Sequence, residues 1–549
     1  MPWIDRYYGQ LFRQIYTFQS TMLVVFRYRS VSSCSVRDSG VGSEMEKSKN
    51  AIVILLDSLN RHMLGAYGGD EFETPNIDRF AARSTRFDKH FVGSLPCMPA
   101  RHDILVGSLD FLWKPWGSIE LWEEPITQPL RENGVTTMLV SDHPHLFETG
   151  GENYHTEFRG WEYVRGHEND PWKTRPDPSW AGAPALPAGV GMNQRYNTTR
   201  TWFREEADFP GPRTMQTAAD WLNENAGFHD RFMLFIDEFD PHEPFDTPEP
   251  WANKYDPDWR EELIIWPPYS VKTVERGVIS ARQAHHVRAN YGSKLSMIDH
   301  WFGKLLDAVD NNGLWDDTVV ILCTDHGHYL GERDIFGKPG VPHFEPMGHT
   351  PLMIHVPGVA AGSVDALTTN VDINATLYDI FDLTPRYRAH GVSLLPLVHG
   401  ETTSVREWAL SGVWGRWVHV FDGSRKYARA PVNDDNLPLS LWSNRWSTMP
   451  IISAPKLKLP NPDRRAYLDY MPGSDIPVIR QPFEPGDRKP YWCRNQPINW
   501  HCLYDIDNDP QETDNRLGGR DETDMMELLR TALADVEAPE EQLERLGLG

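Results

Sequence analysis

The chain has 549 residues, of which 40% are hydrophobic and 24% are charged, and its formal net charge at pH 7 is −24. This length and composition exclude disordered and fibrous proteins and predict a globular fold with one large and one smaller domain. The strong negative charge argues against nucleic acids and anionic membranes as partners, because basic surfaces bind both of them.

The first 44 residues contain one short apolar stretch, TMLVVF at 21–26. It is too short to span a bilayer and no small-residue cleavage site follows it, so we expect neither membrane insertion nor a signal peptide. We expect residues 1–44 to be a poorly structured N-terminal extension. The lack of a convincing signal peptide favours a cytoplasmic location, with the periplasm and secretion as alternatives.

Four runs rich in β-forming residues predict strands, and the continuous apolar runs at 50–56 and 318–323 predict strands buried on both faces. Each run leads into acidic or histidine side chains. The four are 50–56, followed by Asp57; 136–145, which includes His143 and His145; 231–239, followed closely by His242; and 318–323, followed by Asp325 and His326.

Amphipathic helical patterns lie between these strands, at 76–87 and at 290–313, where Gly313 suits a helix stop. The alternation predicts an α/β fold with a mostly parallel central sheet flanked by helices. After about Pro385 the chain changes to short strands with many Trp and Pro residues, which predicts a smaller α+β subdomain. We therefore expect a catalytic domain at 45–385 and the subdomain at 386–549.

Asp57, Asp325 and His326 stand at the ends of two predicted core strands. The carboxyl ends of parallel strands meet at one edge of a sheet, so we expect these side chains to share a crevice. Two carboxylates favour a hard divalent metal such as Ca²⁺, Mg²⁺ or Mn²⁺, and the histidine widens the choice. The alternative is that each aspartate only caps a turn or a helix.

Cys97 lies in SLPCMPARHDILVG, between Pro96 and Pro99 and just before an apolar helical run. A helix that begins there would place the cysteine at its positive N-terminal end, which suits an anion. The alternative is a buried and inert cysteine. The chain has five cysteines, far apart and without a CxxC pair, so no disulfide framework is expected.

The segment CMPAR, followed by Gly107, resembles the signature of the sulfatase family, which is usually CxPSR and then a helix with a Thr-Gly pair. Ala100 replaces the usual serine. The resemblance extends from Asn50 to Asn515 and implies an alkaline phosphatase-like fold. Further segments similar to family landmarks occur in the same order at 74–92, 318–338, 351–358, 390–400 and 503–515.

The resemblance implies a role for each matching residue. A separate formylglycine-generating enzyme would oxidise Cys97 to formylglycine, the nucleophile. The modified residue 97 would bind one divalent metal together with Asp57, Asp325 and His326, with Ca²⁺ as the first expectation and Mn²⁺ or Mg²⁺ as alternatives. The expected catalytic partners are Arg101, which holds the nucleophile and the ester oxygens, Lys338, which neutralises the transferred group, and His242, which protonates the leaving oxygen.

Three departures from the family pattern concern the metal and the substrate. Ser58 stands where most sulfatases carry a second aspartate, and the related phosphonate monoester and phosphodiester hydrolases also lack an acid at that position. The usual GKWH segment reads SDHPH here, so His143 or His145 is expected to bind substrate. Lys114 lies nearest to the place of the missing histidine after the signature and is the expected second cation.

The sequence thus predicts a sulfuric ester hydrolase that acts on a sulfate ester of a carbohydrate or aryl compound. One alternative is a phosphonate monoester or phosphodiester hydrolase of the same superfamily, favoured by Ser58 and by the pair Asp325 and His326. The other is a scaffold that binds sulfated glycans without cleaving them. Because related folds host many chemistries, the fold alone does not decide among the three.

Overall fold

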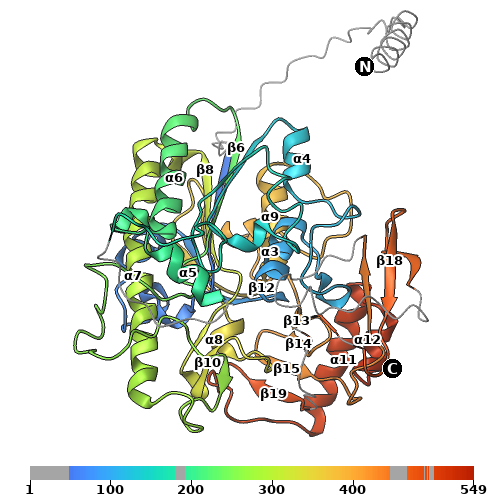
Figure 1. Ribbon diagram of the computed structural model, residues 1–549. Helices are drawn as coiled ribbons and strands as arrows, with labels where there is room; N and C mark the ends of the chain where they lie inside the picture. The colour runs from blue at the N-terminus through green and yellow to red at the C-terminus, as the bar shows by residue number, and fades with distance from the viewer. Residues whose placement is uncertain (1–47, 181–191, 445–465, 488, 491–492, 494–499) are drawn as a thin grey trace, which may run out of the picture. The chain divides into compact units, whose positions relative to one another are not determined.

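The computed structural model describes residues 48–180, 192–444, 466–487, 489–490, 493 and 500–549 (Figure 1). The extension expected at 1–44 lies outside the described residues. Residues 46–549 belong to one compact unit. Among the described helices, none combines the length and apolar character that crossing a membrane requires. The domain boundary expected near residue 385 stays a prediction.

A central sheet of eight strands organises the fold, and one strand, β11, runs antiparallel to its neighbours. The four strands expected from the apolar runs, β8, β1, β6 and β4, lie side by side in its middle, which confirms the mostly parallel α/β fold. In spatial order the strands are β12 (Gly362–Thr369), β2 (Thr85–Phe91), β11 (Met353–His355), β8 (Thr318–Cys323), β1 (Asn50–Leu56), β6 (Phe232–Glu238), β4 (Thr136–Ser141) and β5 (Gly160–Tyr163).

Helices cover both faces of the sheet because β1 is apolar at every position from Ala51 to Leu56. Its residues 51, 53 and 55 pack with α3 (Cys97–Val106) and α9 (Asn370–Ile380). Its residues 52, 54 and 56 pack with α6 (Pro210–Asn225) and α7 (Ala281–Asn311), which lie on the opposite side in Figure 1. Burial of each Val, Ile or Leu side chain of this strand contributes about 1.5–3 kcal/mol, so the strand that leads to Asp57 is held firmly.

The two expected helices had different outcomes. The pattern at 290–313 is the second part of α7, which begins nine residues earlier because Ser280 and Gln283 form a capping box there. Gly313 follows that helix with φ +64°, as a helix stop requires. The helix expected over 76–87 is wrong in its second half. The helix α2 (Pro75–Ala81) ends early, and β2 follows because β11 and β12 pair with both of its edges.

The C-terminal part has the α+β character that its sequence predicts. A five-stranded sheet has the order β19-β15-β14-β13-β3, and a three-stranded sheet has the order β16-β18-β17. The strand β3 (Ser94–Leu95) leads directly to Cys97 and pairs with β13, so this sheet supports the approach to the cysteine. The other bounds are β13 (Ala409–Val413), β14 (Val418–Phe421), β15 (Arg425–Arg429), β16 (Ser440–Ser443), β17 (Tyr467–Tyr470), β18 (Pro477–Pro482), β19 (Cys502–Asp505), α11 (Gly519–Asp535) and α12 (Glu540–Arg545).

A third small sheet carries Lys338. Its strands are β7 (Ser270–Val271), β10 (Ile335–Gly337) and β9 (Tyr329–Leu330), and Lys338 follows β10 directly. The remaining α-helices of the described chain are short: α4 (Thr127–Glu132), α5 (Met192–Arg200), α8 (Glu345–Gly348) and α10 (Leu395–Val398). The four described cysteines, Cys97, Cys323, Cys493 and Cys502, are free thiols.

Candidate active site

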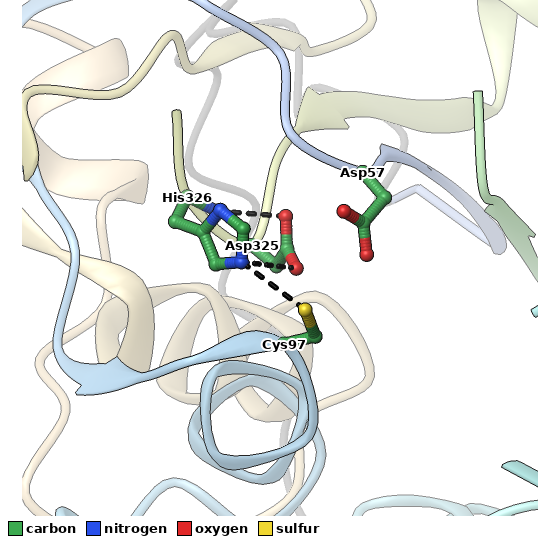
Figure 2. A group of neighbouring side chains, drawn as sticks. All are labelled: Asp57, Cys97, Asp325 and His326. Atoms are coloured by element: carbon green, nitrogen blue, oxygen red, sulfur yellow. Dashed lines mark hydrogen bonds and ion pairs between the residues drawn. The ribbon is translucent and has the colours of Figure 1, made fainter. Parts of the chain in front are cut away.

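The structure brings together the four residues expected to bind a metal (Figure 2). Asp57 directly follows β1, Asp325 and His326 follow β8, and Cys97 is the first residue of α3. One ligand atom from each residue lies within 4.8 Å of the others, and all four side chains are buried. The cysteine Sγ is 3.2 Å from Nε2 of His326. Parallel strand ends and a helix start therefore meet at one point.

The donor set suits a divalent cation. The Nδ1–H of His326 donates to the carbonyl of Gly327 at 2.8 Å, which leaves the Nε2 lone pair facing the cluster. The Oδ2 atom of Asp57 accepts no hydrogen bond from the described residues, although Arg101 forms an ion pair with it at 2.9 Å. Burial and the charge of Asp325 raise the pKa of Asp57, so a cation bound here would stabilise the ionised carboxylates.

The Cys97 thiol itself is a poor nucleophile in this setting. Burial, and then the charge of Asp57, raise its pKa well above the ordinary value for cysteine. The reactive form of cysteine is the thiolate, so the unmodified side chain would stay protonated and unreactive.

Arg101 lies one helical turn after Cys97 and is fully surrounded by partners. Its Nη1 donates to Asp325 at 2.9 Å and to the carbonyl of Cys97 at 3.2 Å. A residue that sequence reasoning missed, Asp237 at the end of β6, holds the guanidinium through both oxygens at 2.7 and 2.8 Å. The signal was present, because Asp237 ends an apolar run in the same way as Asp57. This bidentate pair fixes the plane of the guanidinium.

His242 and Lys338 meet beside Cys97. The Lys338 Nζ is 3.5 Å from the Cys97 Sγ and 2.7 Å from the Nε2 of His242. The Nδ1–H of His242 donates to the carbonyl of Glu243 at 2.7 Å, so Nε2 is the nitrogen that can accept a proton. Burial lowers the pKa of His242 well below its ordinary value, the charge of Glu243 opposes this effect, and Lys338 adds to it.

Glu243 is a second residue that the sequence did not single out. Its carboxylate accepts a short hydrogen bond from Tyr269, and it lies 3.2 Å from the Nε2 of His328 and 3.5 Å from the Nδ1 of His242. Burial opposes ionisation, but the charges of His242 and Lys338 hold the pKa of Glu243 well below its usual range. An ionised carboxylate thus stands behind His242, on the side away from Nε2.

His143 and His145 lie next to this group. Both ring nitrogens of His143 are buried without a hydrogen bond from the described residues, and its Nδ1 is 3.9 Å from Asp237. His145 already forms ion pairs, since it contacts Glu148 and lies 3.4 Å from Glu168. These partners outweigh burial and raise the pKa of His145 to about 10. His143 is therefore the one of the two with free hydrogen-bonding capacity.

Lys114 lies in a different cluster. Its Nζ donates to the carbonyl of Ser118 at 3.0 Å and to Glu123 at 2.5 Å, and this buried group also includes His102 and Asp110. The position gives no support to the expected role in substrate binding, which stays a prediction. Lys114 and Arg388 already neutralise the two carboxylates, so this second group of acids does not favour a metal.

The comparisons with known proteins agree with this arrangement. Residues 49–383, more than half of the chain, match the family model described as Sulfatase. The chain belongs to the sulfatase family. A choline-sulfatase of Rhizobium meliloti is 26% identical to this sulfatase over 427 residues, which cover 71% of the chain and 79% of that relative. Human iduronate 2-sulfatase is 24% identical over 377 residues, which cover 59% of the chain and 64% of that relative.

Solved structures share the fold of this sulfatase. A protein in complex with its substrate D-glucosamine-2-N,6-O-disulfate has a TM-score of 0.61 and 15% identity, covering 90% of this chain and 99% of that one. The phosphonate monoester hydrolase of Agrobacterium radiobacter has a TM-score of 0.59 and 18% identity, covering 89% and 95%. The named relatives confirm the expected class of enzyme, a sulfuric ester hydrolase.

Proposed function

We propose that this sulfatase hydrolyses a sulfate ester of a carbohydrate or aryl compound through formylglycine made from Cys97. The observation that carries the proposal is the convergence on the Cys97 Sγ of His326 Nε2 at 3.2 Å and Lys338 Nζ at 3.5 Å. A formylglycine-generating enzyme would be a transient partner. Asp57, Asp325, His326 and residue 97 would hold one divalent metal, with Ca²⁺ as the first candidate and Mn²⁺ or Mg²⁺ as alternatives.

The modification and the metal supply complementary chemistry. Hydrated formylglycine provides one hydroxyl to attack sulfur and a second to release sulfate, and the metal provides positive charge for the ester oxygens. Arg101, fixed by Asp237, orients residue 97 and those oxygens. Lys338 lies within reach of the same oxygens and neutralises charge that develops on them.

His242 would supply the proton for the leaving oxygen. Its Nε2 faces Lys338 and the Cys97 side, while its Nδ1–H stays bonded to the Glu243 carbonyl. A proton on Nε2 makes the ring a cation, which the Glu243 carboxylate at 3.5 Å stabilises. We therefore assign general acid catalysis to His242 and a positioning role to Glu243.

Replacing Glu243 with Gln is expected to move the alkaline limb of the kcat profile to lower pH by about one unit. Glu243 raises the pKa of His242. Without its charge, His242 loses the catalytic proton at a lower pH. The profile is measured with an alkyl sulfate, whose leaving oxygen needs that proton. Glu512→Gln, which removes a buried carboxylate paired with Lys426 elsewhere, should leave the limb in place. An unmoved limb in Glu243→Gln would refute the positioning role.

A phosphonate monoester or phosphodiester hydrolase is the second candidate, and Ser58 favours it. The Ser58 hydroxyl donates to Asp57 at 2.8 Å and its backbone N–H donates to Asp325 at 3.0 Å. This residue thus orients two ligands without adding the charge of a second aspartate. The third candidate, a non-catalytic glycan-binding scaffold, is disfavoured because Arg101 and Lys338 contact Cys97 and His242 contacts Lys338, an arrangement that binding alone does not require.

The first experiment measures the mass of the tryptic peptide that contains Cys97, on protein made in a host able to generate formylglycine. We expect a loss of about 18 Da relative to the cysteine form. The same protein is then assayed with sulfate monoesters, phosphonate monoesters and phosphate diesters, and we expect sulfate esters to give the highest kcat/KM. Preference for phosphonates or diesters would select the second candidate. An unmodified Cys97 with no hydrolysis of any ester would select the glycan-binding scaffold.

A further inference from the structure

The edge of the central sheet continues beyond the catalytic group towards β5. The metal-ligand residues follow β8 and β1, His242 follows β6, His143 follows β4, and residues 167–169 follow β5. These five strands are parallel neighbours, so their carboxyl ends lie along one edge. His242 is the proposed donor to the leaving oxygen. The edge from β6 to β5 is therefore on the side where the leaving group departs.

Three imidazole rings surround the side chain of Phe239 on this edge. The centroid of the Phe239 ring is 4.2 Å from that of His242, 4.3 Å from that of His143 and 4.7 Å from that of His167. His143 and His167 therefore each contact the ring that stacks on the proposed acid. The three imidazoles form one cluster around Phe239 at this edge.

Several polar atoms on this edge are buried without a hydrogen bond from any residue that the structure describes. Leaving such an atom unpaired is unfavourable, because the atom loses its hydrogen bonds to water and gains none in return. A concentration of them beside a reaction centre therefore indicates a place for a ligand. The atoms are both ring nitrogens of His143, Nδ1 of His167, Oε2 of Glu168 and Oδ1 of Asn169, although the Nε2 of His145 lies 3.4 Å from the Glu168 oxygen. The side chains are at least nine-tenths buried, with exposures of 0%, 2%, 6% and 7%.

We propose that His143, His167 and Asn169 bind the leaving-group alcohol and that this alcohol is polyhydroxylated, so that the substrate is the sulfate ester of a saccharide. This inference rests on the proposed function and makes it more specific. A hydroxyl both donates and accepts, so it can pair with an imidazole nitrogen and with an amide oxygen. Burial lowers the pKa of both histidines, so neutral rings face the ligand.

Other leaving groups fit these atoms less well. A trimethylammonium group offers neither donor nor acceptor, and a simple aryl ring leaves the same nitrogens and oxygen unpaired. Two of the nearby acids already have cationic partners: Glu168 lies 3.4 Å from His145, and Asp240 lies 2.6 Å from Lys294. Among the described residues of this edge, Asp142 and Glu238 each keep one carboxylate oxygen without a hydrogen bond, but burial raises the pKa of both well above the ordinary value, which favours the neutral acid over a counterion for an organic cation.

The test compares two variants with one matched control. His143→Phe and Asn169→Leu remove the unpaired atoms while keeping the size of each side chain. His419→Phe makes the same change at another buried histidine, on β14 against His343, whose two nitrogens accept no hydrogen bond from, and donate none to, the residues that the structure describes. Each protein is assayed with hexosamine monosulfates, choline sulfate and 4-nitrophenyl sulfate. Turnover of the aryl ester also reports whether each variant is folded and modified.

We expect the unaltered enzyme to hydrolyse a hexosamine sulfate with a higher kcat/KM than choline sulfate. Each site variant should lower that kcat/KM about ten- to hundredfold and change that of 4-nitrophenyl sulfate less than about threefold. His419→Phe should change neither. Equal losses on both esters, no loss, or preference for choline sulfate would overturn the saccharide assignment while sulfatase activity stands. Failure to hydrolyse any sulfate ester would overturn the proposed function itself, and this inference with it.

Discussion

Replacing Cys97 with Ala is expected to lower kcat/KM for every sulfate ester by at least about 10⁴-fold, because it removes the nucleophile. The remaining groups, Arg101, Lys338 and His242, would still bind and polarise the ester, so binding should weaken far less than turnover. Turnover is measured with 4-nitrophenyl sulfate, and binding by competition with inorganic sulfate. The same variant should bind a divalent metal more weakly, because one of four ligands is lost.

Cys502→Ala is the matched control, since it truncates another buried cysteine, on β19 away from the site. This control should retain full activity, and both variants should unfold at temperatures within a few degrees of the parent protein. Activity that survives in Cys97→Ala within tenfold of the parent would show that another residue attacks the ester. The formylglycine mechanism would then be wrong, while family membership would stand.

Local pattern was sufficient to predict the centre of the fold. The runs at 50–56 and 318–323 are apolar at nearly every position, as strands buried on both faces must be, and the runs at 136–145 and 231–239 contain apolar stretches at 138–140 and 232–236. All four form adjacent strands in the structure. Because parallel strands end at one edge of a sheet, the sequence also predicted that Asp57 lies near Asp325 and His326, and the structure places them together. Neither inference needed knowledge of which strand pairs with which.

Contacts between distant segments could not be predicted in the same way. The partner of Arg101, Asp237, is separated from it by 136 residues, and no pattern near Arg101 points to it. Glu243 was hidden because its role depends on Tyr269 and His328, which come from two other segments. Lys114 was expected near the substrate because it lies near the signature in sequence. In the structure, the Lys114 ammonium instead donates a hydrogen bond to the carboxylate of Glu123, nine residues further along the chain.

The segment 76–87 illustrates how tertiary pairing overrides local periodicity. Its apolar residues recur at helical spacing, and the first half does form α2. The second half becomes β2 because backbone hydrogen bonds with β11 on one side and β12 on the other are available there. Those partner strands lie within residues 353–369, so the twelve residues of the segment 76–87 carry no information about them.

Replacing His242 with Gln is expected to lower kcat for an alkyl sulfate by about 10²- to 10⁴-fold, the usual contribution of a general acid. An alkoxide is a poor leaving group, so its oxygen must receive a proton as the bond to sulfur breaks. By contrast, 4-nitrophenolate is a stable anion that leaves without one. Its sulfate ester should therefore lose less than about tenfold under the same substitution. The measurement is the ratio of the two losses.

This ratio separates proton donation from a merely structural role. If His242 only supported Lys338, which contacts its Nε2 at 2.7 Å, both esters would lose activity together, because Lys338 acts on the sulfate group that they share. His286→Gln is a suitable control, since His286 is a buried histidine on α7 that pairs with Asp256 instead. It should leave both rates unchanged. A strong dependence on the leaving group in His242→Gln alone would place the catalytic proton on this residue, and parallel losses would move it to another group.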